Sequence, residues 1–231
     1  MFSPGTILIG IGDERFANTI KSIDFVIPDG SVEAVKEVMA TGHFSEQISI
    51  CPDTKKCVEG SSPDRLHPHP SFHMHVPIRG LSVGIYVQSE TLWFLPPLDA
   101  TLASPKANPL PPYLTFACDP TALPPDNAGM GRGAFSLDQT VVLVPKVHIL
   151  TEALMRIMAR DDATKVGSYS GAHLCYIVRY VEKRGILDIG LLPEGLGNVY
   201  REFRDGPASV PLVVIKLKRL LGVSLPLRFY D

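Results

Sequence analysis

The segment from Arg15 to Ile27 places one carboxylate inside an apolar run. Asp24 lies among β-favouring side chains, and Ser22 stands two residues before it. Carboxylates on such a strand can hold Mg²⁺ against phosphate oxygens during phosphoryl transfer. Mg²⁺ requires near-octahedral oxygen ligation, usually with one or two carboxylates among its ligands. The hydroxyl of Ser22 is neutral at pH 7 and a poor metal ligand, so Asp24 is the one anionic ligand that this segment offers.

The first half of the chain has the patterns of a small sheet with flanking helices. An apolar strand over 6–12 ends in Gly10 and Gly12, and a second apolar strand over 23–27 stops at Pro28-Asp29-Gly30. Ser31 is the expected N-cap of a helix that runs to Met39. Alternating apolar residues over 71–87 predict a β-hairpin. These patterns favour an α/β (α+β) fold with a small mixed sheet in residues 1–94.

The second half of the chain changes character twice. Nine prolines fall between Leu95 and Pro125, which excludes a regular helix or a central strand there. Residues 95–135, which also contain glycines, are therefore predicted to be a connector. Residues 136–231 have helical spacing and are predicted to form a helical subdomain, with helices over 147–158, 168–183, 198–204 and 209–221. Gly185 is the expected end of the second of these helices.

The overall composition limits the possible partners and the compartment. The chain has 231 residues, of which 45% are hydrophobic and 20% charged, and its net charge is −2. This balance gives no strong signal for nucleic acid, and no apolar run is long enough to span a membrane. The first residues lack the features of a signal peptide, so the expected protein is soluble and cytoplasmic. The four cysteines are expected to be reduced thiols.

Arg15 ahead of the acidic strand, together with the order of a sheet followed by helices, resembles the minimal nucleotidyltransferase-fold proteins, in particular divergent members from filamentous fungi. The resemblance covers most of the chain. It implies that Asp24 is the remaining metal-binding and catalytic acid, and that Gly10, Gly12, Arg15 and Ser22 contact a nucleotide. It implies Mg²⁺ as the metal, and ATP or another nucleotide as the ligand.

The same resemblance implies that several functional side chains are missing. Ser22 stands where the family has its first acid, and Gly84 stands where it has the third acid. Glu152 stands where a phosphate-facing lysine is expected. Replacement carboxylates from the nearby turns remain an alternative: Asp13, Glu14 and Asp29.

These losses favour a degenerate protein of the nucleotidyltransferase fold, a pseudoenzyme, which acts by binding a nucleotide or small molecule or a protein partner. The alternative is an active Mg²⁺-dependent nucleotidyltransferase, or an accessory enzyme of fungal secondary metabolism that uses the same cleft. Whether the protein is an enzyme stays open at this point. A further alternative is a shortened product that lacks a first helix before the glycines.

Two other groups of residues need an interpretation. His67 and His69 alternate with prolines in an expected surface loop, whereas His73 and His75 alternate along the predicted hairpin. Imidazoles at this spacing share one face of a strand and can begin a metal site, but the simpler expectation is that His73 and His75 face solvent. Lys216, Lys218 and Arg219 are expected to form a solvated basic face.

A hydrolase site was the last alternative. The segment Gly167-Ser168-Tyr169-Ser170-Gly171 superficially resembles a nucleophile elbow, but no core strand is predicted before it, and its expected role is to start a helix. His148 and His173 fall within predicted helices, where surface or core positions are the ordinary interpretation.

Overall fold

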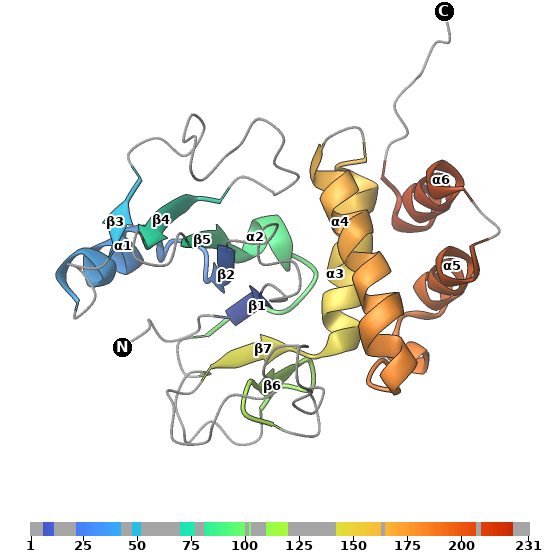
Figure 1. Cartoon of the computed structure of the whole chain (residues 1–231), viewed down its shortest axis with the longest axis horizontal. Helices are drawn as coiled ribbons and strands as arrows, with labels where there is room; N and C mark the ends of the chain where they lie inside the picture. The colour runs from blue at the N-terminus through green and yellow to red at the C-terminus, as the bar shows by residue number, and fades with distance from the viewer. Residues whose placement is uncertain are drawn as a thin grey trace, which may run out of the picture. The chain divides into compact units, whose positions relative to one another are not determined.

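A computed structural model describes residues 7–11, 22–42, 48–51, 70–76, 81–99, 102, 110–119, 142–162, 165–206 and 209–223 (Figure 1). The chain divides into two units. The first comprises residues 1–64 and 69–146, and the second comprises residues 65–68 and 147–231. Gly12, Arg15, Asp13, Glu14, His67 and His69 lie outside the described residues.

The first unit contains one mixed sheet, which confirms the predicted fold class. Among the described residues it has seven strands. Their order across the sheet is β3 (Ser49–Ile50), β4 (Phe72–Val76), β5 (Leu81–Val87), β2 (Ser22–Ile27), β1 (Ile7–Ile11), β7 (Leu143–Pro145) and β6 (Leu114–Phe116). β2 and β5 are parallel, as are β1 and β7, whereas the other neighbours are antiparallel.

The apolar face of the sheet forms the core of this unit. Side chains alternate between the faces of a strand, so odd-numbered residues of β2 and β5 lie on the same side as even-numbered residues of β4. The buried cluster on this face consists of Phe25, Ile27, Phe72, Met74, Val83 and Ile85, together with Val35 of helix α1 (Val32–Thr41). α1 begins after Ser31, as predicted, although the Ser31 side chain makes no capping hydrogen bond.

The proline-rich segment is anchored to the sheet at its start. Helix α2 (Gln88–Thr91) follows β5. The buried side-chain amide of Gln88 donates from Nε2 to the Pro96 carbonyl at 2.8 Å, and its Oε1 accepts from the backbone amide of Leu98 at 2.7 Å. Further along, β6 is a short edge strand inside the segment 95–135 that was predicted to be a connector. An edge position suits a strand in a proline-rich segment because one side of its backbone needs no partner strand. The first unit extends to Lys146 and therefore includes β7.

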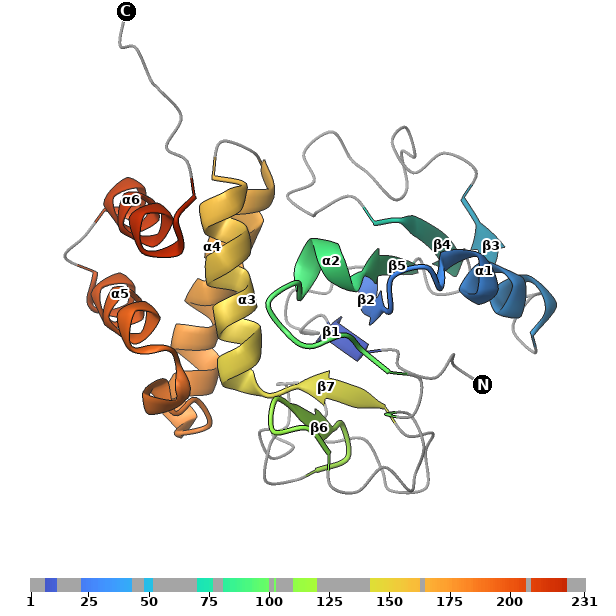
Figure 2. The same cartoon turned by 180° about the vertical axis from the view of Figure 1, so that it is seen from behind.

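The second unit consists of helices packed around their own core, as predicted. Its elements in the described residues are α3 (Val147–Arg160), α4 (Lys165–Tyr176), a π-helical turn (Ile177–Val181), short 3₁₀ turns (Glu182–Arg184 and Ile189–Leu191), α5 (Glu194–Asp205) and α6 (Val210–Leu221), which Figure 2 shows from behind. Gly185 ends the α4 segment with a φ of 72°, a conformation that glycine adopts without strain. The core includes Met155, Leu174, Leu196, Tyr200 and Leu217.

No helix in the described part of the chain is both long enough and apolar enough to cross a membrane.

Candidate functional site on the polar face of the sheet

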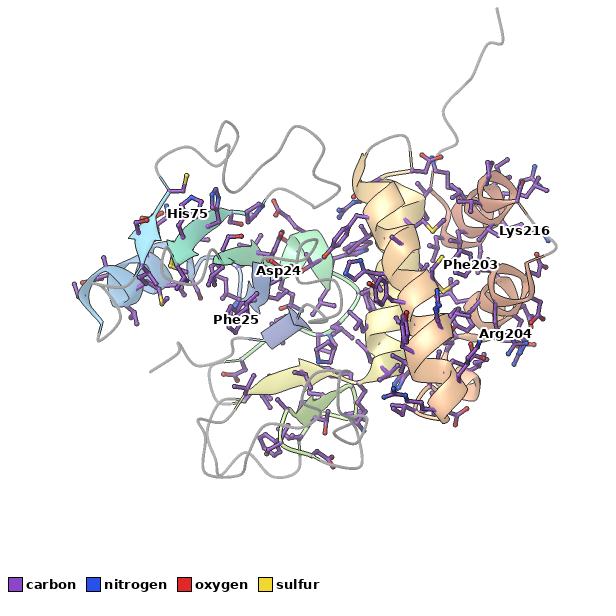
Figure 3. The ribbon with its side chains drawn as sticks, in the orientation of Figure 1. Asp24, Phe25, His75, Phe203, Arg204 and Lys216 are labelled. Atoms are coloured by element: carbon purple, nitrogen blue, oxygen red, sulfur yellow. The ribbon has the colours of Figure 1, made fainter. Side chains whose placement is uncertain are left out.

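On the second side of the sheet, polar groups gather over β2, β4 and β5, and we call this region the polar face. It contains Asp24 on β2, Ser82, Gly84 and Tyr86 on β5, His73 and His75 on β4, and Cys51 directly after β3, with the buried Val26 of β2 beside them. Asp24 and its neighbour Phe25 belong to opposite faces of the sheet, as their parity on β2 requires (Figure 3). The sheet therefore separates potential chemistry from the hydrophobic core.

One row of register partners crosses the middle of this face. Gly10 pairs with Asp24, Asp24 with Gly84, and Gly84 with His73, so the row crosses β1, β2, β5 and β4. Asp24 thus has a glycine beside it on each neighbouring strand. The row brings together Gly10, predicted to bind nucleotide, Asp24, the predicted acid, and Gly84, where the resemblance predicts an acid.

The carboxylate of Asp24 extends over Gly84. A Cβ atom at position 84 would lie 2.6 Å from Asp24 Oδ1 and 3.1 Å from Cε2 of Tyr86. Real Cβ atoms do not approach oxygen this closely, so a side chain at position 84 would have to displace the Asp24 carboxylate. Asp24 itself is only 9% exposed. The space that a side chain at position 84 would need is already filled by the Asp24 carboxylate.

The remaining positions named by the resemblance differ in their surroundings. Ser22 precedes Asp24 on β2 and pairs in register with Ser82. Asp29, a candidate replacement acid, accepts a hydrogen bond from the backbone amide of Ser89 at 3.1 Å and thereby joins the turn after β2 to α2. Glu152, at the expected lysine position, is buried and accepts two hydrogen bonds from the Arg156 guanidinium within α3.

The structure corrects the prediction that both hairpin histidines face solvent. The hairpin itself is confirmed, with β4 and β5 antiparallel. His73, however, is only 4% exposed, and His75 is half-buried. The prediction failed because alternation gives the face of a residue but not whether that face is covered. Cys51 lies beside these histidines, in agreement with the expectation that cysteines could lie near the histidine cluster, although a strand of two residues gives almost no periodic signal to place it.

A second correction concerns the basic residues near the carboxyl end. Lys218 is only 3% exposed, and its ammonium donates to Asp162 Oδ1 at 2.7 Å. Lys216 is exposed and bonds to Glu202. Helical periodicity does place position 218 near the inward side of α6, next to Leu217, and the partner of its charge lies 56 residues away in the sequence.

The serine-containing segment at the start of α4 is helical and not an elbow after a strand. α4 already begins at Lys165, and Ser170 is buried within it. Gly167 permits a close approach, because a Cβ there would lie 2.6 Å from the Asp161 carbonyl oxygen. His148 and His173 both lie in helices, as predicted. Burial lowers the pKa of His173, although a hydrogen bond to the Tyr169 carbonyl opposes this effect.

Comparisons of the chain with protein-family models, with curated proteins and with solved structures found no match in any of the three.

Proposed function

We propose that this protein is a catalytically degenerate nucleotidyltransferase-like protein that binds a nucleotide at the polar face without transferring it. The observation that carries the proposal is the pairing of Asp24 with Gly84 on parallel strands. The pairing supports the proposal because the resemblance expects a second acid at position 84, directly beside Asp24. One carboxylate is therefore present where a catalytic site of this kind would have two or three.

The metal requirement explains why binding is favoured over transfer. Two-metal transfer needs several carboxylates to hold the ions that activate the attacking and leaving oxygens. The described residues do not supply that set, because Gly84 has no ligand atom and Asp24 Oδ1 fills its Cβ space. A single Mg²⁺ can nevertheless be held by one carboxylate together with nucleotide phosphates and water. Loss of one preorganised charge-stabilising group costs about 3 kcal/mol of catalysis, so losing two acids would reduce transfer severely.

The test is calorimetry with ATP, CTP, GTP and UTP, each with Mg²⁺ and with EDTA. We expect Mg²⁺-dependent binding of at least one nucleotide, and we expect Asp24→Asn to weaken it about tenfold or more, since the neutral amide cannot replace a carboxylate on Mg²⁺. Glu37→Gln is the matched control, because Glu37 is exposed on α1 and the substitution makes the same change of charge.

Two results would contradict the proposal in different ways. Mg²⁺-dependent incorporation of labelled nucleotide into any acceptor, abolished by Asp24→Asn, would show an active transferase. No binding of any nucleotide, or equal binding by wild type and Asp24→Asn, would remove the polar face from nucleotide recognition.

A further inference from the structure

Three side chains with metal-ligand chemistry meet at the β3–β4 end of the polar face. His73 and His75 are two residues apart on β4, so their imidazoles share one face. Cys51 follows β3 directly, and its backbone amide donates to the His73 carbonyl at 3.0 Å. This bond continues the register in which Ser49 faces His75, so it places Cys51 opposite His73. The cluster is therefore held by strand pairing.

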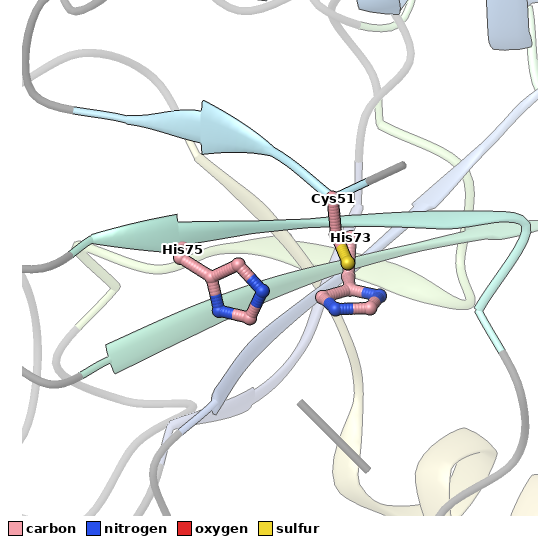
Figure 4. Close-up of side chains that lie close together, drawn as sticks. All are labelled: Cys51, His73 and His75. Carbon is pink, nitrogen blue, oxygen red and sulfur yellow. The ribbon is translucent and has the colours of Figure 1, made fainter. Parts of the chain in front are cut away.

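The donor atoms of this cluster are close to one another. One ligand atom from each of Cys51, His73 and His75 lies within 4.8 Å of the other two. The two imidazole rings are perpendicular, with centroids 4.9 Å apart. Figure 4 shows the sulfur of Cys51 next to the His73 ring, with the His75 ring on the same side of the strands. The three donors thus surround a common volume.

The type and spacing of these donors suit a borderline-soft divalent cation. Thiolate and imidazole are preferred by zinc, whereas Mg²⁺ and Ca²⁺ prefer oxygen. Zinc bonds of about 2.0–2.3 Å in a tetrahedron place neighbouring donor atoms roughly 3.5 Å apart. The donor atoms now lie within 4.8 Å of one another. Rotation of the three side chains that moves each donor atom by about an ångström or less would bring them to the zinc spacing. Cys51 and His75 are only half-buried, so solvent reaches the cluster.

We propose that Cys51, His73 and His75 bind one Zn²⁺, with a water molecule completing a tetrahedral site. Three protein donors and one exchangeable position are the arrangement found at reactive zinc sites, whereas purely structural sites use four protein ligands. The thiol of Cys51 loses its proton when the metal binds, so zinc uptake is linked to proton release.

This site is separate from the proposed nucleotide site. Asp24 is not a member of the donor cluster, and Gly84 on β5 separates Asp24 from His73 in the row of register partners. The two sites also differ in metal chemistry, since one carboxylate with phosphates suits Mg²⁺ and a Cys-His₂ set suits Zn²⁺. Asp24→Asn should leave zinc binding unchanged, and Cys51→Ser should leave Mg²⁺-dependent nucleotide binding unchanged.

Titration of the reduced, metal-free full-length protein with Co²⁺ tests the proposal, because Co²⁺ reports its ligands by absorption. We expect one Co²⁺ per chain, a thiolate-to-metal charge-transfer band, and intense visible bands of a tetrahedral ion that Zn²⁺ abolishes. Addition of azide should shift the visible bands by replacing the water. Cys51→Ser should remove the charge-transfer band, and His75→Asn should weaken metal affinity more than about 100-fold, since losing even an outer-shell partner costs 10–100-fold.

Matched controls separate this site from binding elsewhere. Cys118→Ser removes another thiol, and the double variant His67→Asn/His69→Asn removes two imidazoles that precede the hairpin in the sequence. Both should bind Co²⁺ as wild type does, and circular dichroism should show that every variant is folded. Absence of the charge-transfer band in wild type, its persistence in Cys51→Ser, or loss of binding in either control would overturn the proposal. A spectrum unaffected by azide would contradict the proposal that the fourth ligand is an exchangeable water molecule.

Discussion

The polar face of the sheet and the interior of the helical unit bury polar groups in contrasting ways. In the helical unit, opposite charges form pairs: the Lys218 ammonium donates to Asp162, and Glu182 accepts from the Arg204 guanidinium and also from the neutral Tyr200 hydroxyl. On the polar face, the sheet instead gathers groups of similar chemistry, namely carboxylate, imidazole and thiol. Paired charges stabilise a fold, whereas a group of metal-ligand types can bind an additional cation. The two regions therefore differ in chemistry: opposite charges meet in the helical unit, and potential metal ligands meet on the polar face.

Breaking the buried ion pair of the helical unit should have the largest effect on stability. Asp162→Ala leaves the Lys218 ammonium buried without its carboxylate, and such losses cost about 3–5 kcal/mol. The Asp162 side chain keeps 18% exposure, so we expect about 3 kcal/mol in urea unfolding. Lys218→Met, which removes the charge and keeps the volume, should cost much less. Equal losses for the two variants would mean that packing, and not the charge pair, sets the stability here.

Filling the space over Gly84 should have the next largest effect. Gly84→Ala forces the Asp24 carboxylate to move, and overpacking of this kind costs about 1–3 kcal/mol. Asp24→Ala should relieve much of that cost, so the double variant should be more stable than the sum of the single changes predicts. Denaturant unfolding of all four proteins measures the coupling. Additive effects would show that the two positions do not compete for space.

Removing the acceptor of the Tyr200 hydroxyl should destabilise the protein by an amount in the same range. Glu182→Ala leaves the fully buried Tyr200 without its 2.9 Å hydrogen bond, and an unsatisfied buried hydroxyl costs about 1–3 kcal/mol. Tyr200→Phe combined with Glu182→Ala should recover part of that loss, because no orphaned hydroxyl remains. Thermal and urea unfolding of the double-mutant cycle check this expectation. A double variant no more stable than Glu182→Ala alone would contradict it.

The smallest expected effect concerns pH. Burial lowers the pKa of His173 below its ordinary value, so the unfolded chain takes up this proton more readily than the folded protein does. Stability should therefore fall as pH drops below about 6.5 and level off below the folded-state pKa. His173→Phe keeps an aromatic ring beside Tyr169 and removes the titration. The free energy of unfolding, measured from pH 7.5 down to pH 5, should change less with pH in this variant than in the wild type. An equal pH dependence in the two proteins would exclude the effect.

The fold was largely predictable because periodicity reports secondary structure directly. The apolar run at 23–27, the hairpin and the helices after Pro145 all follow from alternation or helical spacing, and the structure contains each of them. Glycine after the helix at 168–183 also marked an actual end at Gly185. Each of these signals depends only on residues that are close together in the sequence, so a single sequence is enough to predict the corresponding element.

The candidate site was predictable only in part, because burial and pairing are not local properties. The sequence could identify Asp24 and Gly84 as residues of interest. Their adjacency depends on the register between β2 and β5, which the sequence alone does not give. The burial of His73 depends on what covers the polar face, and the bond between Lys218 and Asp162 joins separate helical segments. The position of Cys51 opposite His73 could not be derived from the sequence, because β3 has only two residues and gives almost no periodic signal. Such facts arise only once the strands and helices have been assembled.

The close approach at Gly84 also bears on how reversible a loss of function would be. With the Asp24 carboxylate already in the volume beside position 84, a single codon change that installs an acid there displaces the acid that remains. Two neighbouring carboxylates would therefore need coordinated changes at both positions, because each single change would carry a cost. Laboratory selection for metal-dependent transfer should randomise both positions together.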